Sequence, residues 1–160
     1  MNRKTAREIA VQLCFASLNS EQNAFELVSS FFEQEYYHTL LEEDELFVQL
    51  PDDRQLEYIR RLVTLVEEKQ EELDGYIEKY SQGWKLGRIS KTALAVLRCA
   101  LCEILYVEDV PASVAINEAV ELDKGYDEPD TVAFVNGVLG GFMKGEFPKD
   151  PESVEEPSPV

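Results

Sequence analysis

The sequence predicts an all-α fold, a compact bundle of about six to seven helices. In most segments, apolar residues recur at i, i+3, i+4 and i+7, the spacing that places them on one helix face. Helix-start signals precede several of these segments. One segment is apolar on nearly all sides, which is typical of a helix at the centre of a bundle.

Residues 3–19 and 22–37 are the first two predicted helices, each with one apolar face. The second is rich in phenylalanine, and we expect its rings to belong to the core. Residues 38–52 break the apolar period, and their acidic run predicts a solvated connection. They lack the alternating oxygen ligands and central glycine of a calcium loop.

A third, longer helix begins at Pro51, because the acids that follow favour the positive end of the helix dipole. It extends to about Tyr80, and we expect a bend at Gly75. Ser90 is the predicted N-cap of the next helix, residues 93–107, which is the most apolar in the chain. We expect that helix at the centre of the bundle.

The last two predicted helices begin near prolines. Pro111 lies near the first turn of a helix that reaches about Lys124, where its missing N–H costs nothing, and Pro129 starts the other. Small residues lie four apart on the last helix: Ala133, Gly137 and Gly141. One side of that helix is therefore nearly bare backbone, which can approach a neighbouring helix closely.

The length of 160 residues suits one domain that buries roughly two thirds of its unfolded surface. We expect this domain over residues 1–144, and a disordered acidic tail over residues 145–160. No stretch approaches the roughly 18–20 apolar residues of a membrane span, so we expect a cytoplasmic protein without a membrane partner. Three cysteines, an odd number, do not suggest a disulfide framework.

Catalytic and metal-binding patterns are missing from the sequence. His38 is the single histidine, and neither a P-loop nor a G-x-G-x-x-G motif occurs. Cys99 and Cys102 form a C-x-x-C pair, but they lie in the most apolar helix, where thiols are buried and their pKa is raised. A structural zinc site needs about four ligands, and only Cys14 and His38 remain to complete one. We therefore expect a binding protein, without enzymatic activity, metal or cofactor.

The charge distribution restricts nucleic-acid binding to a small part of the surface. The net charge of −17 repels phosphate backbones and favours basic partners. Arg3, Lys4 and Arg7 form the one cationic cluster near the N-terminus, ahead of the first acid, Glu8. These bases either bind phosphate or form an ordinary solvated helix start.

Two asparagines, Asn117 and Asn136, interrupt helix-like apolar periodicity. Asparagine is a mediocre helix former, and a buried amide without a partner costs roughly 1–3 kcal/mol. We therefore expect packing or binding to compensate for each of them.

Four stretches occur in an order that identifies a family. They are "AREIAVQLCF" in the first helix, "LAVLRCALCEILY" in the apolar helix, "VPASVAINEAVEL" after it and "FVNGVLGGF" in the last helix. The chain strongly resembles the transcription antitermination factor NusB family. The likeness covers the first helix and roughly residues 80–143, and fades over residues 22–80 and the tail. A NusB-like domain fused to some ribosomal RNA methyltransferases shares this pattern.

The resemblance implies an all-α bundle in two helical halves that binds the boxA segment of nascent ribosomal RNA leaders. It implies joint binding with a basic small-subunit ribosomal protein, in an antitermination complex with RNA polymerase. The bases would position phosphates, the aromatic rings would stack on unpaired bases, and an aspartate would accept from a base edge. Carried over to this chain, the RNA-binding residues are Arg3, Lys4, Arg7, Phe15, Asp130 and Phe134.

Each of these residues also has a structural interpretation. Phe134 and Phe15 lie beside apolar stripes and can be core residues, and Asp130 can be a helix-start charge. For Asn117 and Asn136 we favour a structural role, in which their amides bond exposed backbone groups where the last two helices meet.

The chain also departs from the family pattern. Its N-terminus has fewer arginines, Ala133 stands where a lysine is common, and Gly140 and Gly141 replace better helix formers. RNA affinity alone should be weak, so we expect the basic ribosomal protein to bind first. Two alternatives remain: a protein-binding or self-associating module, such as a homodimer, without RNA contact, or an accessory domain related to the methyltransferases.

Overall fold

The computed structural model describes residues 2–41 and 53–148, and these ranges contain seven α-helices, one short 3-10 helix and no strand. The predicted all-α class is therefore confirmed for this part of the chain. The helices are α1 (Arg3–Ser17), α2 (Ala24–Leu41), α4 (Asp53–Glu68), α5 (Gln70–Tyr80), η2 (Leu86–Arg88), α6 (Lys91–Tyr106), α7 (Ala112–Asp123) and α8 (Pro129–Glu146).

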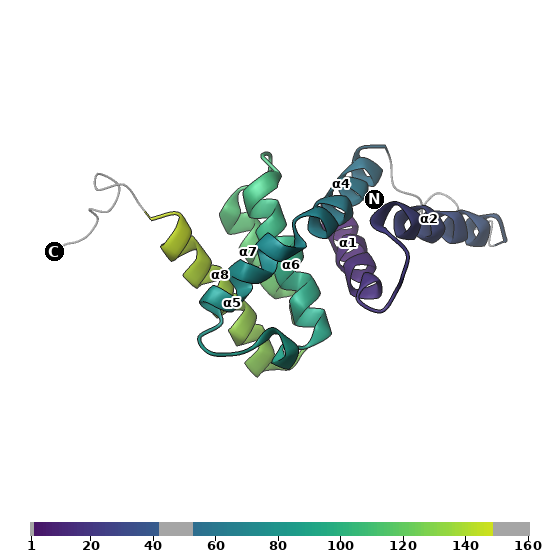
Figure 1. Ribbon diagram of the computed structural model, residues 1–160. Helices are drawn as coiled ribbons and strands as arrows, with labels where there is room; N and C mark the ends of the chain where they lie inside the picture. The colour runs from purple at the N-terminus through teal and green to yellow at the C-terminus, as the bar shows by residue number, and fades with distance from the viewer. Residues whose placement is uncertain (1, 42–52, 149–160) are drawn as a thin grey trace.

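The helices form two groups, as Figure 1 shows: α1, α2 and α4 on one side, and α5 to α8 on the other. Helix α6 contacts members of both groups, namely α1, α4, α5, α7 and α8. Its residues 93–103 are all buried, so it is the central helix that its apolar sequence predicts. The predicted cap is also confirmed, because the Ser90 side chain accepts a hydrogen bond of 3.0 Å from the Ala93 backbone N–H.

The long third helix is in fact two helices, and the predicted bend at Gly75 is wrong. Helix α4 ends at Glu68 and α5 begins at Gln70, with Lys69 between them at φ −104° and ψ 16°. The chain turns here because the apolar faces of α4 and α5 pack against different helices. Helix α4 packs on α1, α2 and α6, while α5 packs on α8 and α6. Gly75 lies inside α5 and is exposed.

The small residues of α8 approach a neighbouring helix closely only near the C-terminal end of α8, where they face α5. Gly137 is exposed, and a Cβ added there would meet nothing within 4 Å. At Gly141 the added atom would lie 3.3 Å from the Tyr80 ring, and at Gly145 it would overlap the Tyr80 hydroxyl. Residues four apart drift by about 40° around a helix of 3.6 residues per turn, so the stripe rotates from solvent towards α5.

Some predicted segments fall outside the structure. Helix α2 continues to Leu41, and the rest of the expected connection, residues 42–52, lies outside the described residues. Helix α8 continues to Glu146, and residues 149–160 of the expected tail are also outside them. Within the described ranges, no helix is long and apolar enough to span a bilayer.

The three thiols are buried, as their place in the sequence predicts. A hydrogen bond with Cys14, 3.5 Å between the sulfur atoms, and burial raise the pKa of Cys99 well above its usual range. Burial raises the pKa of Cys102 to about 12. Cys99 and Cys102 are therefore protonated near neutral pH, and all three thiols pack as small buried groups.

Candidate nucleic-acid interface

Arg7, one of the three bases at the start of α1, is a buried structural residue. Only 5% of it is exposed, and its Nε and Nη2 donate to the two carboxylate oxygens of Glu103, each at 2.9 Å. The Tyr58 hydroxyl donates to the same carboxylate. Burial alone would lower the pKa of Arg7, but its hydrogen bonds and charge interaction with Glu103 raise it, so the guanidinium stays ionised. This geometry does not support the phosphate contact expected of Arg7.

Arg3 and Lys4 remain accessible, but contacts hold the Arg3 side chain in place and do not hold that of Lys4. The Arg3 Nε donates to Gln55 Oε1 at 3.0 Å, and its guanidinium carbon lies 4.0 Å from the centre of the Tyr58 ring. Lys4 is exposed, and it has no hydrogen bond or ion pair within the described ranges. Both bases border a hollow of about 410 Å³ between the starts of α1, α4 and α7, which we call the N-terminal hollow. Its charged residues are Arg3, Lys4, Arg7, Arg54, Asp109 and Glu118.

Carboxylates surround the other side of the same cluster. A second hollow, of about 370 Å³, is lined by Lys4 and Arg7 together with Glu8, Glu118 and Glu121. Anionic groups outnumber cationic ones there, whereas cations outnumber anions in the N-terminal hollow. The open positive face of the cluster is therefore the one towards α4.

Phe15 lies on an exposed face of α1 and is 40% exposed. The positions of Lys4, Glu8, Gln12 and Phe15 repeat with helical spacing, so this face runs about 16 Å from Lys4 to Phe15. The Gln12 side chain donates to the Tyr126 hydroxyl at 3.1 Å, and that hydroxyl donates to Glu8 at 2.8 Å. These bonds attach the face to the loop between α7 and α8.

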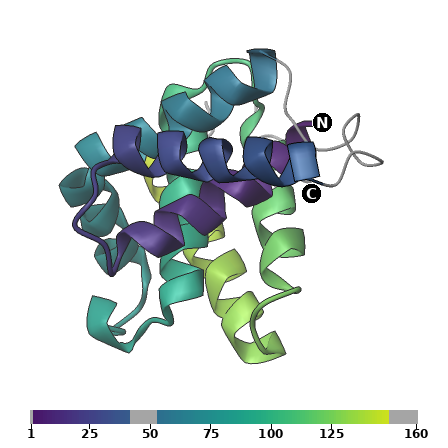
Figure 2. The ribbon, with the colours of Figure 1, turned by 90° about the vertical axis from the view of Figure 1, so that its right-hand side faces the viewer.

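Asp130 and Phe134 lie at the start of α8, which Figures 1 and 2 both place at the opposite end of the bundle from the N-terminus. Asp130 is exposed. Phe134 is half-buried, and its ring centre lies 5.1 Å from that of Trp84, which is 53% exposed. Within the described ranges, no hydrogen bond, ion pair or ring contact joins this group to the N-terminal hollow. The starts of α1 and α8 therefore lie at opposite ends of the bundle, while the face of α1 that carries Phe15 is bonded to the loop before α8.

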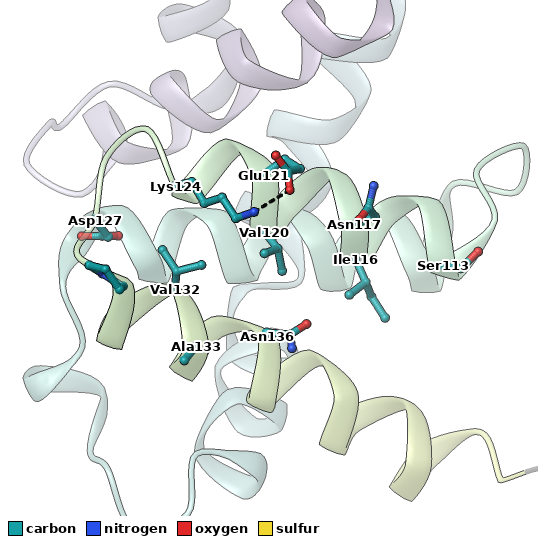
Figure 3. Close-up of a pocket in the computed structure, with 11 residues that line it drawn as sticks. Ser113, Ile116, Asn117, Val120, Glu121, Lys124, Asp127, Val132, Ala133 and Asn136 are labelled. Atoms are coloured by element: carbon teal, nitrogen blue, oxygen red, sulfur yellow. Dashed lines mark hydrogen bonds and ion pairs between the residues drawn. The ribbon is translucent and has the colours of Figure 1, made fainter.

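Asn117 and Asn136 line a groove of about 860 Å³ between α7 and α8, shown in Figure 3. Both side chains are exposed, and neither makes a hydrogen bond within the part of the chain that the structure describes. The expected bonds to backbone groups are therefore wrong. Ala115 and Ala119 lie on the buried face of α7, and Asn117 lies on the opposite, exposed face. Its amide can therefore hydrogen-bond with water.

A buried pair of carboxyl groups lies where α7 ends. Asp123 is fully buried, and neither of its oxygens has a hydrogen-bond donor in the described residues. Burial and the neighbouring Asp127 carboxyl raise the pKa of Asp123 to about 7. The Ser90 hydroxyl donates to Asp127 Oδ1 at 3.3 Å, and Asp127 Oδ2 is buried without a donor. With its pKa raised, the Asp123 carboxyl is largely protonated below neutral pH and can donate to Asp127.

Comparison with known proteins decides the family. Residues 4–144 match the NusB family. The chain belongs to the NusB family. It is 42% identical over 144 residues to the transcription antitermination protein NusB of Acetivibrio thermocellus, with 90% of each chain covered. It is 39% identical over 155 residues to the protein of the same name from Ruminiclostridium cellulolyticum, with 97% of each chain covered.

Solved NusB structures have the same fold. NusB from T. maritima matches with a TM-score of 0.66 and 28% identity, covering 90% of this chain and 92% of that one. A crystal structure of the antitermination factors NusB and NusE in complex with dsRNA matches with a TM-score of 0.69 and 24% identity, covering 89% and 96%. The second likeness is too distant to show more than the fold. The family and the NusB-like bundle that the sequence predicts are confirmed.

Two features of this NusB-family chain were missed in the sequence. Arg54 lies in the first turn of α4, where a charge usually faces solvent, and only the packing of α4 on α1 places it in the N-terminal hollow. Asp123 follows Ala115 and Ala119 at intervals of four on the buried face of α7. That register was the available signal for its burial.

Proposed function

We propose that this chain is a transcription antitermination factor that binds boxA-type RNA of nascent ribosomal transcripts, jointly with a basic small-subunit ribosomal protein. It acts in the cytoplasm by binding, without catalysis, in a complex with RNA polymerase. The proposal rests on one observation: cations from two helices, Arg3, Lys4 and Arg54, border one open hollow in a chain of net charge −17.

The N-terminal hollow suits a phosphate group of a single strand. Arg3 is held by Gln55 and by the Tyr58 ring, and its terminal nitrogens make no hydrogen bond within the described residues. A cation that is already oriented loses less side-chain entropy when it binds. Lys4 and Arg54 add two mobile charges beside it, and Phe15 offers a partly exposed ring on which a base can stack.

The same charges explain why a basic partner is needed. Ion pairs within the chain occupy several cations: Arg7, Lys79, Arg98 and Lys124. The field of the remaining acids repels RNA at a distance. A positively charged ribosomal protein bound to this body would reduce that repulsion and extend the cationic surface. A chain with this fold occurs in a crystal structure of NusB and NusE in complex with dsRNA, and that assembly is compatible with such a joint surface.

The proposal is tested by titrating labelled boxA-like single-stranded RNA with the chain, with and without the ribosomal protein, at two salt concentrations. Replacing Lys4 and Arg54 together by alanine should weaken binding. It should also reduce the slope of log affinity against log salt by about 1.4, since each phosphate contact on a single strand contributes about 0.7. The matched control replaces Arg60 and Lys144, two cations outside the hollow that make no ion pair in the described residues, and should leave the slope unchanged.

Two outcomes would count against the proposal. Equal RNA affinity with and without the ribosomal protein would contradict the proposal that the two proteins bind RNA with a joint surface. No RNA binding by the pair, with partner binding retained, would favour a module that binds proteins only. Light scattering of the free chain would then show whether it associates with itself.

A further inference from the structure

Two buried thiols face each other across the boundary between the two groups of helices. Cys14 lies on α1 and Cys99 on α6, and they are 3% and 2% exposed. Their sulfur atoms are 3.5 Å apart, whereas the bond of a disulfide is about 2.05 Å long. The two atoms are therefore already in contact, and joining them requires an approach of about 1.5 Å.

The third thiol, Cys102, is less suited to pair with Cys99. The two residues lie three positions apart on α6, and Cβ atoms at this spacing are about 5–6 Å apart on a helix. A disulfide requires about 3.5–4.5 Å between its Cβ atoms. The C-x-x-C pair could close only if α6 distorted, and α6 is packed against helices of both groups. The thiol on the other helix, Cys14, is therefore the better partner for Cys99.

The position of Cys14 in the last turn of α1 gives an oxidant access to the pair. Helix α1 ends at Ser17, and residues 18–22 beyond it are half-buried or exposed. Helix ends open locally far more often than the whole chain unfolds. The hydrogen bond with Cys14 and burial raise the pKa of Cys99 well above its usual range, so the closed pair holds little of the reactive thiolate. Opening of the last turn of α1 therefore controls the rate of oxidation.

We propose that Cys14 and Cys99 form a redox-sensitive lock, which closes as a disulfide in the presence of a peroxide. One thiolate attacks hydrogen peroxide and becomes a sulfenic acid, and the hydroxide that leaves takes up a proton to give water. The second thiol then displaces the sulfenic hydroxyl as another water molecule and forms the S–S bond. In total, two thiols lose two electrons and two protons, and one peroxide becomes two water molecules. A thiol reductant reopens the bond by exchange.

The lock acts at the C-terminal end of α1. Arg7, two turns before Cys14, is already paired with Glu103 on α6, one turn after Cys99. The disulfide adds a covalent link at the other end of α1, beside the exposed ring of Phe15. It joins residues 85 positions apart, and a bond that closes so long a loop strongly restricts the unfolded chain. Oxidation therefore stabilises the chain and fixes α1 on α6. This inference goes beyond the proposed RNA binding and does not depend on it.

Mass spectrometry of the folded full chain, before and after treatment with hydrogen peroxide, tests the lock directly. We expect the intact mass to fall by about 2 Da and to return after reduction, and peptide mapping to join Cys14 to Cys99. Cys102→Ala is the matched control, because it removes the other buried thiol of α6 and should still lose this mass. Cys14→Ala and Cys99→Ala should not lose it. Circular dichroism verifies that each variant is folded, and mapping of the parent chain requires no variant.

The effect of the lock is measured on the oxidised and reduced parent chain. The urea midpoint should rise by about 1–2 M on oxidation, because the bond restricts the unfolded chain. Backbone amides in the last turn of α1 should exchange their hydrogens about tenfold more slowly. Oxidised Cys14→Ala should show neither change.

Several results would overturn the lock and leave the proposed RNA binding untouched. A disulfide between Cys99 and Cys102, a disulfide between two chains, or sulfinic acids in place of any disulfide would show that the facing pair does not close. A Cys14–Cys99 disulfide that leaves both the urea midpoint and the exchange of α1 unchanged would show that closing it locks nothing.

Discussion

The raised pKa of the buried Asp123 carboxyl leads to a specific prediction about stability. No cation faces Asp123 in the described residues: its neighbour is the Asp127 carboxyl, which the Ser90 hydroxyl contacts from α6, and Lys124 is paired with Glu121. Asp123→Asn keeps the shape of the side chain and supplies a neutral donor for Asp127. We expect this variant to be more stable than the parent chain at pH 8 and about equally stable at pH 4.

The sign and size follow from the raised pKa. Below about pH 4, Asp123 is protonated in both the folded and the unfolded chain. As the pH rises, the unfolded chain releases the proton near 3.8, while the folded chain keeps it until about pH 7. Each pH unit between these values lowers the free energy of unfolding by about 1.4 kcal/mol. The loss reaches roughly 4 kcal/mol by pH 8, and Asp123→Asn should recover about 2–4 kcal/mol of it.

Urea unfolding at several pH values, followed by far-UV circular dichroism, measures this effect. The charge of the whole chain also changes with pH, so the difference between variant and parent is the relevant quantity. Glu78→Gln removes one exposed acid, and its difference from the parent should stay within about 0.5 kcal/mol at every pH. An Asp123→Asn variant whose stability follows the parent curve from pH 5 to 8 would refute the raised pKa of Asp123.

Four further substitutions concern stability and can be measured by the same unfolding experiment. Arg7→Ala should lower the free energy of unfolding by about 3–5 kcal/mol, because it leaves the buried Glu103 carboxylate without its partner. Lys4→Ala should change it by less than about 0.5 kcal/mol. Equal effects of the two substitutions would contradict the buried ion pair. Gly137→Ala should stabilise by up to about 1 kcal/mol. Gly145→Ala should lack this gain, because its Cβ would overlap the Tyr80 hydroxyl and force the ring to move, and a variant stabilised as much as Gly137→Ala would rule out that contact. Ser90→Ala should cost about 1 kcal/mol by removing the cap of α6, and an unchanged midpoint would show the cap to be dispensable.

The helices were predictable because apolar spacing and start signals are local properties of the sequence. The central helix α6 was recognised from its composition, and Ser90 from its position before it. The break at Lys69 was not predictable, because no proline or glycine marks it and the turn arises from packing α4 and α5 against different neighbours. Gly75, the residue with the lower helix propensity, stays inside a helix that tertiary contacts hold in place.

The site was predicted less well, because burial of a charge depends on its partner. Arg98 and Glu103 are the two buried charges of α6, and a buried charge is stable only when an opposite charge from another helix pairs with it. Arg98 found Asp74 at 2.8 Å, and Glu103 found Arg7 at 2.9 Å. The spacing of Arg7 with Val11 and Cys14 on the buried face of α1 was a signal for this pairing. A base at a helix start therefore became a core residue.

The loss of Arg7 to the core changes how this acidic chain can hold RNA. Of the cations that remain open, Arg3, Lys4 and Arg54 border the N-terminal hollow, and Lys85 and Arg88 flank Trp84. Neither group alone offsets a net charge of −17 at physiological salt, where charges beyond about 8 Å are screened but contacts are not. Binding should therefore depend steeply on a basic partner that adds cations beside the N-terminal hollow.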